Sequence, residues 1–192
     1  MVASNKMQMK FSKFEIKEIA KAWIAVSLVF AIALVGLNAK LIAALPIALV
    51  TAGIAFLLHE LAHKFVAQNY RCWAEFRAND TALLIGILLS FTGLILLAPG
   101  GVYIHGASKQ QHGRIAFAGP LMNILLALVF LGLASITTNA LGAIMSYGFT
   151  INAYLAIFNM IPFPPFDGHA VWQWNKIVYF AGVIAAGLLL ML

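Results

Sequence analysis

The decisive stretch of this sequence is FLLHELAHKF, residues 56–65, which lies at the end of a long apolar run. It contains a His-Glu-x-x-His pattern made of His59, Glu60 and His63. Residues four apart on a helix share a face, so both imidazoles can point at one metal ion while Glu60 handles a proton. Ionisable groups inside a membrane segment cost about 2.5–3.5 kcal/mol each on insertion scales and therefore indicate function. A zinc ion bound to the two histidines would offset that cost.

The composition around this stretch is that of an integral membrane protein. Of the 192 residues, 63% are hydrophobic and only 9% are charged, whereas soluble domains carry about 25% charged residues. The apolar runs are long and unbroken, which indicates helices. The single cysteine, Cys72, excludes an intrachain disulfide. The net charge of +6 does not indicate nucleic-acid binding, because the basic residues lie at the ends of apolar runs, as topology signals do.

These patterns predict an all-α polytopic membrane protein with a single membrane-embedded domain over residues 1–192 and its core at 41–175. Residues 1–21 are basic and form a cytoplasmic or interfacial segment, in which Ser12 and Glu15 have the capping-box spacing that begins a helix. About five full spans are expected, at 22–37, 41–58, 115–136, 143–161 and 176–192. Short β-strands are expected near the cytoplasmic face, at 72–77 and 102–105.

The charge distribution predicts how these spans are oriented. If the amino terminus is cytoplasmic, only Lys40 of the twelve Lys and Arg residues falls outside, which is a strong positive-inside bias. For the span at 115–136 to leave from the cytoplasmic side, the apolar segment 81–99 must enter and exit on that side. We therefore predict a re-entrant or hairpin segment at 81–99. The next two spans then bring Asp167 to the same side and depth as His59.

Two further motifs follow the first one along the chain. They are AGPLMN at 118–123 and NMIPFPPFDG at 159–168. With the His-Glu-x-x-His pattern, they make the chain resemble the site-2 protease family of intramembrane zinc metalloproteases. The resemblance implies that His59, His63 and Asp167 bind one zinc ion per chain and that Glu60 is the catalytic acid and base. It also implies a membrane-spanning protein as substrate.

Two asparagines are candidates for contact with that substrate. Asn159 precedes Asp167 by eight residues, and Asn123 ends the second motif. Either side chain could donate a hydrogen bond to the substrate or to a developing oxyanion. Either could instead join two helices, as asparagine does in membranes. We favour function for Asn159 and leave both roles open for Asn123, whereas His105, His112 and His169 are expected to be loop residues, His169 lying next to the site.

The expected activity is that of a zinc-dependent endopeptidase in a prokaryotic cell membrane, cutting transmembrane proteins near the cytoplasmic side of the bilayer. A substrate helix would have to unwind, and an exposed strand edge could hold it as an extended strand by backbone hydrogen bonds. The alternative is a membrane metal-ion transporter that uses the same ligands as a transit site. A transporter would be expected to spread its ligands along a path and would give Glu60 no clear role. A catalytically idle scaffold is a third possibility.

Overall fold

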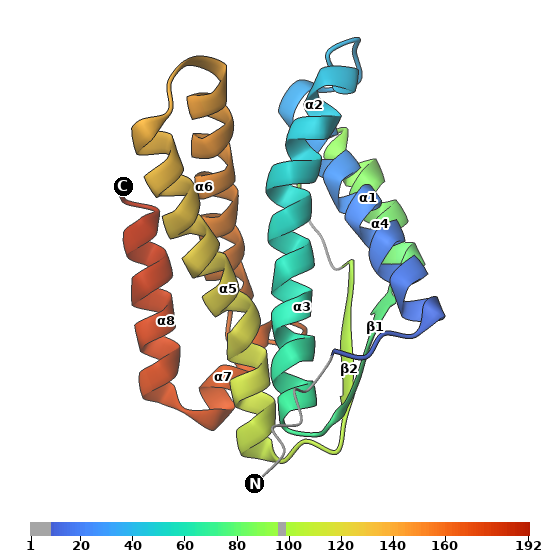
Figure 1. The fold of residues 1–192 in the computed structure, drawn as a ribbon, viewed down its shortest axis with the longest axis vertical. Helices are drawn as coiled ribbons and strands as arrows, with labels where there is room; N and C mark the ends of the chain where they lie inside the picture. Colours follow the sequence, from blue (N-terminus) through green and yellow to red (C-terminus); the bar gives the residue numbers. More distant parts are fainter. Residues whose placement is uncertain (1–8, 96–98) are drawn as a thin grey trace, which may run out of the picture.

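A computed structural model describes residues 9–95 and 99–192, which form a mostly helical protein with one small sheet (Figure 1). The helices and strands, in chain order, are α1 Lys13–Val35, α2 Leu41–Ala48, the π-helix η1 Leu49–Gly53, α3 Ile54–Asn69, β1 Trp73–Ala78, α4 Asp80–Ser90, β2 Gly100–His105, α5 Lys109–Ile136, α6 Asn139–Asn159, α7 Asp167–Trp174 and α8 Lys176–Leu189. Helix α3 lies at the centre. Helices α5, α6 and α8 flank it on one side, and α1 and α4 flank it on the other (Figure 1).

Four of the described helical segments are long and apolar enough to cross a membrane. They are Lys13–Val35, Leu41–Asn69, Lys109–Ile136 and Asn139–Asn159. The fifth expected span, at 176–192, is represented by α8, which has 14 residues and is therefore shorter than a typical span of about 20 residues. The structure confirms a helical protein with the apolar helices of a membrane protein, but it does not confirm the count of five spans.

Helix α1 begins where the sequence predicts. The Ser12 side chain accepts a hydrogen bond from the Glu15 backbone N–H at 3.0 Å, which is the capping interaction that the spacing of these two residues indicates. The helix ends at Gly36, whose φ of 71° is readily adopted only by glycine. The Glu15 carboxylate does not return to the cap, however, and instead reaches Lys64 and strand β1.

The helix that carries the histidines is continuous from Leu41 to Asn69 and has a π-helical turn in its middle. Pro46 lies just before this turn and cannot donate a backbone hydrogen bond. The indole N–H of Trp23 donates to the Leu49 carbonyl at 3.3 Å, so α1 satisfies a carbonyl of the irregular turn. Irregular turns of this kind often occur near functional sites in membrane and soluble helices.

The segment between the two strands leaves the sheet and returns to it. Strands β1 and β2 are antiparallel, with Ala78 opposite Gly100, and the Asn79 N–H donates to the Pro99 carbonyl at 3.0 Å. The described part of this segment contains α4, a helix of 11 residues. Its two ends therefore lie side by side, as expected for a segment that enters and exits on one side. The two predicted short strands are confirmed.

Small residues bring the remaining helices close together. The cluster between α5, α6 and α8 is built mainly from alanines, including Ala127, Ala153 and Ala186. A Cβ on Gly148 of α6 would overlap the Phe130 ring of α5. Close packing of small residues is the usual way in which membrane helices associate. The α5–α6 hairpin carries the chain back to the end of the bundle where α7 begins.

Candidate metal centre

The histidine pair lies on one face of α3. His59 and His63 are both buried, and their ring centroids are 4.6 Å apart. The spacing of four residues places one imidazole above the other, as the helix repeat requires. Both rings point toward the start of α7.

Asp167 completes the group from a distant part of the chain. It is the first residue of α7, and its Oδ2 lies 3.1 Å from Nε2 of His59 and 3.3 Å from Nε2 of His63. One ligand atom from each of the three residues lies within 4.8 Å of the others.

Hydrogen bonds on the far side of each ring fix the orientation of the imidazoles. His63 Nδ1–H donates to the Ile115 carbonyl at 2.7 Å. His59 Nδ1 lies 2.5 Å from Asn123 Oδ1. The amide nitrogen of Asn123 donates to the Ala55 carbonyl and to Asn152, so its oxygen is the acceptor and His59 Nδ1 carries the hydrogen. In a neutral ring this leaves Nε2 as a lone pair directed at the centre of the group.

These residues fit a bound zinc ion. With both Nδ1 atoms donating away from the group, two Nε2 atoms and one carboxylate oxygen converge, and a cation between them would be bound by all three. Two imidazoles and one carboxylate are a ligand set of catalytic zinc, which leaves one coordination position for water or substrate. The hydrogen bonds to Nδ1 are the outer contacts that orient histidine ligands in zinc sites.

Two glycines provide the space that the group occupies. A Cβ on Gly119 of α5 would overlap the Nε2 atoms of both His59 and His63. A Cβ on Gly168 would overlap the Met160 carbonyl at the end of α6. Glycine at both positions therefore lets α5 and the start of α7 approach α3 closely enough for the three ligand atoms to meet. Gly119, which belongs to the motif at 118–123, therefore lies at the centre of the site.

Glu60 faces the same cavity as the three ligand candidates. The cavity has a volume of about 220 Å³ and is lined by residues of α3, β2, α5, α6 and α7. Glu60 is buried, and its Oε2 has no hydrogen-bond partner among the described residues. A buried carboxylate oxygen without a partner is costly unless a ligand, an ion or water completes it. A water molecule in the cavity could donate a hydrogen bond to this oxygen.

The two asparagines predicted as substrate contacts lie in different places. Asn159 lines the cavity, while its amide nitrogen donates to the Leu155 carbonyl of its own helix at 2.9 Å. Asn123 is completely buried behind His59 and does not line the cavity. Of the two roles that the sequence leaves open for Asn123, this geometry favours the structural one, in which the side chain orients His59.

The remaining histidines are not part of the ligand group. His169 lies near the Pro162 carbonyl and Gln173, and so turns away from its neighbour Asp167. His105 stacks on Trp73 at the end of the sheet. His112 is a helical residue of α5 that lines the cavity, although the sequence predicted a loop there.

One residue of the site was missed in the sequence. Asn152 of α6 accepts from Asn123 at 3.1 Å and donates to the Gly148 carbonyl at 2.8 Å. Its only signal in the sequence is that it is a polar residue within an uncharged, apolar run.

The chain has clear relatives among proteins named as zinc metalloproteases. It is 38% identical over 175 residues to a protein of Methanocaldococcus jannaschii provisionally named zinc metalloprotease MJ0611, and the match covers 88% of this chain and 89% of that protein. It is 26% identical over 172 residues to Mycobacterium tuberculosis Rip2, provisionally named a zinc metalloprotease, covering 80% of this chain and 64% of Rip2. No protein-family model and no solved structure matches the chain. With its ligand geometry and a relative this similar along nearly its whole length, the chain belongs to the site-2 protease family of zinc metalloproteases.

Proposed function

We propose that this chain is an intramembrane endopeptidase that hydrolyses peptide bonds of transmembrane proteins near the cytoplasmic side of the bilayer. The observation that carries the proposal is the convergence of His59, His63 and Asp167 beside Glu60, whose Oε2 has no hydrogen-bond partner among the described residues. The histidines and Glu60 belong to a helical segment that is long and apolar enough to span a membrane. The chemistry would therefore take place at the level of the membrane.

The three ligand residues would hold one zinc ion. When bound, zinc supplies Lewis acidity, which polarises a peptide carbonyl and makes a water molecule easier to deprotonate. Glu60 accepts the proton of that water and later delivers it to the nitrogen of the leaving amine. Asn123 and Ile115 keep His59 and His63 in the orientation that this reaction requires.

The substrate would bind to the outer edge of β2. Gly100, Gly101, Val102 and Ile104 of this strand line the cavity together with Glu60. An unwound segment that pairs with this edge is held extended by backbone hydrogen bonds and presents its peptide bonds to the cavity. Such pairing solves the problem that a peptide bond within a helix is shielded from attack.

The charge distribution supports the cytoplasmic orientation. Lys40 lies in the turn between α1 and α2, at the end of the bundle opposite the sheet and α7 (Figure 1). The other basic residues of the described chain lie at or near the end that carries the site. Basic residues favour the cytoplasmic side, so the catalytic cavity is expected to open there.

Cleavage of a single-pass membrane protein by the detergent-purified chain tests the proposal. Wild-type protein should cut it, a zinc chelator should stop the reaction, and added zinc should restore it. Glu60→Gln should keep its zinc and lose cleavage. A metal transporter would instead retain zinc flux across vesicles in the Glu60→Gln variant and cut nothing, and that result would overturn the proposal.

A further inference from the structure

The outer edge of strand β1 has backbone groups that need partners. In an antiparallel pair, successive residues point their N–H and C=O groups alternately toward and away from the partner strand. The register places Phe76 opposite Val102, and the Phe76 N–H bonds to a side chain outside the sheet. Ala74, Phe76 and Ala78 therefore direct their backbone groups outward. Open edges of this kind normally attract another strand.

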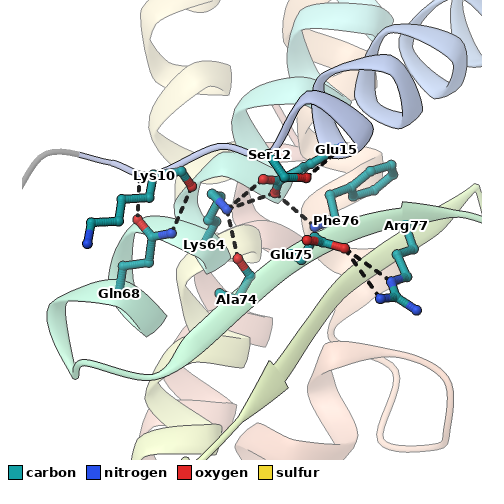
Figure 2. Close-up of polar contacts among 9 residues, drawn as sticks. All are labelled: Lys10, Ser12, Glu15, Lys64, Gln68, Ala74, Glu75, Phe76 and Arg77. Carbon is teal, nitrogen blue, oxygen red and sulfur yellow. Dashed lines mark hydrogen bonds and ion pairs between the residues drawn. The ribbon is translucent and has the colours of Figure 1, made fainter.

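Side chains from α1 and α3 form hydrogen bonds with these outward backbone groups. The Phe76 N–H donates to Glu15 Oε1 at 2.9 Å, and the Ala78 N–H donates to Glu18 Oε2 at 3.2 Å. The Lys64 ammonium donates to the Ala74 carbonyl at 2.7 Å. Figure 2 shows Glu15 and Lys64 lying against β1 where a third strand would lie. Three of the outward backbone groups are thus bonded without a third strand.

The pair at the centre of this arrangement is fully buried. Glu15 and Lys64 are each 1% exposed, and the Lys64 ammonium lies 2.8 Å from the Glu15 carboxylate. A buried ion pair often gains little over a hydrophobic pair, because both charges lose their hydration. Here each charge also binds a backbone group of β1, so the pair performs a task that hydrophobic side chains cannot perform. Lys64 directly follows His63 in α3, so this ion pair connects the edge of β1 to the helix that carries the histidines.

The contacts run along the strand in step with α1. Glu15 bonds Phe76, and Glu18, one turn later on the helix, bonds Ala78. Lys21, a further turn along, pairs with Glu18 at 2.8 Å and with Asp80 at 2.5 Å. Each step of three residues along α1 thus corresponds to a step of two residues along the segment from Phe76 to Asp80. Helix α1 therefore follows the second half of β1 and the start of α4.

The outer edge of β2 is in the opposite situation. Val102 and Ile104 direct their backbone groups away from β1 and line the catalytic cavity. The Val102 N–H points toward the Glu60 carboxylate. No helix side chain of the described residues covers the outward groups of Ile104. The open edge of the sheet is therefore the one beside the catalytic carboxylate.

We propose that Glu15, Glu18 and Lys64 replace a third strand on β1 and so restrict strand addition to β2. The inference rests on the proposed function, because it concerns where an extended substrate pairs. Glu15 and Lys64 are positioning residues, since they act on the substrate through the sheet. Their effect is to hold the hairpin against α1 and α3 with its open edge facing the cavity.

Hydrogen exchange of the backbone tests the closed edge without any substrate. In Glu15→Gln, the side chain loses its charge and one acceptor oxygen is replaced by an NH2 donor, which faces Lys64 or the Phe76 N–H and weakens that contact. The amides of residues 73–78 should exchange faster by about tenfold, the effect of one lost hydrogen bond. Glu75→Gln is the matched control, because Glu75 lies on the same strand but, among the residues that the structure describes, its side chain bonds only Arg77 (Figure 2). Equal exchange in both variants would overturn the inference.

Cleavage kinetics test the consequence for substrate binding. The probe is a short fluorogenic peptide with apolar residues at alternate positions. Glu15→Gln should raise KM by about tenfold and leave kcat and bound zinc unchanged, because the ligand group is not touched.

The outcomes separate this inference from the proposed function. If wild-type protein binds zinc but cuts neither peptide nor membrane protein, the proposed function fails, while the exchange experiment still decides the closed edge. If Glu15→Gln lowers kcat and zinc content together, the pair supports the metal centre and the inference is overturned. If Glu15→Gln does not fold, Glu18→Gln carries the same two measurements, and unchanged exchange at residues 73–78 with an unchanged KM overturns the inference.

Discussion

Asn123 of α5 lies directly behind His59 of α3, and its Oδ1 accepts the His59 Nδ1–H over 2.5 Å. The same side chain binds the Ala55 carbonyl and Asn152, so one amide connects three helices to a single ligand. A contact of this kind determines which ring nitrogen is free for metal. It also explains why a polar residue is completely buried in an apolar helix.

Replacing Asn123 should therefore weaken metal binding without removing a ligand. Asn123→Ala is expected to lower zinc affinity by about 10–100-fold, the usual cost of losing an outer partner of a histidine ligand. Asn152→Ala removes only the hydrogen bond that supports Asn123 and should lower zinc affinity by less than about tenfold. Competition with a zinc indicator measures both. If the two variants bound zinc as wild type does, the orienting role of Asn123 would be disproved.

Asp167 is expected to be required for zinc retention. Asp167→Ala removes the only carboxylate of the ligand group and should reduce bound zinc from about one ion per chain to a small fraction of that. Metal content of the purified protein gives the answer. The matched control is His169→Ala, two residues further on, because His169 faces Pro162 and Gln173 instead of the ligand group. Its zinc content should equal that of wild type.

Gly119 should not tolerate even one added methyl group. In Gly119→Ala the new Cβ overlaps both ring nitrogens, so the histidines must separate and zinc should be lost together with cleavage. Gly132→Ala on the same helix is the control, since no atom lies within 4 Å of the added Cβ. There, higher helix propensity should stabilise the protein by about 0.5–1 kcal/mol. Zinc content and thermal unfolding distinguish the two variants.

The edge of β2 should depend on a backbone donor at Ile104. Ile104→Pro removes the outward N–H while leaving the hydrogen bonds to β1 in place, because Ile104 does not bond across the sheet. We expect kcat/KM to fall by about tenfold for this one lost hydrogen bond. Ile104→Val keeps the donor and should cleave normally. Normal cleavage by the proline variant would show that substrate does not pair with this edge.

The orientation of the chain can be measured by cysteine labelling. Cys72 is buried, so it provides an unreactive background. In intact cells, a membrane-impermeant maleimide should label Asn38→Cys and Ala140→Cys, which lie at the end of the bundle away from the site. It should label Gln110→Cys, near the catalytic cavity, only after the membrane is opened. The opposite pattern would place the cavity outside.

The sequence predicts the site well where the signals are local or follow from span parity. The spacing of His59 and His63 requires only a helix, and the start of α1 follows from Ser12 and Glu15. That Asp167 lies on the same side of the membrane as the histidines is predicted by counting how often the chain crosses the membrane between them. The doubling back of segment 81–99 follows from the same count.

Features that depend on contacts between distant segments could not be predicted. The spacing of Glu15 indicates a cap, yet its carboxylate binds Lys64 and Phe76, 49 and 61 residues away. Nothing in the neighbourhood of Gly119 shows that two imidazoles will lie over it. The fifth span was wrongly extended to residue 192 because apolar composition alone does not indicate where a helix ends.

The separation of 108 positions along the chain between His59 and Asp167 also has a consequence for biosynthesis. During synthesis, the first two-thirds of the chain can enter the membrane before Asp167 has been made, so His59 and His63 are then without the third ligand. If these three residues bind the zinc ion, peptidase activity therefore arises only late in synthesis. A newly made molecule cannot attack its neighbours at the translocon until its final third has been threaded and folded back.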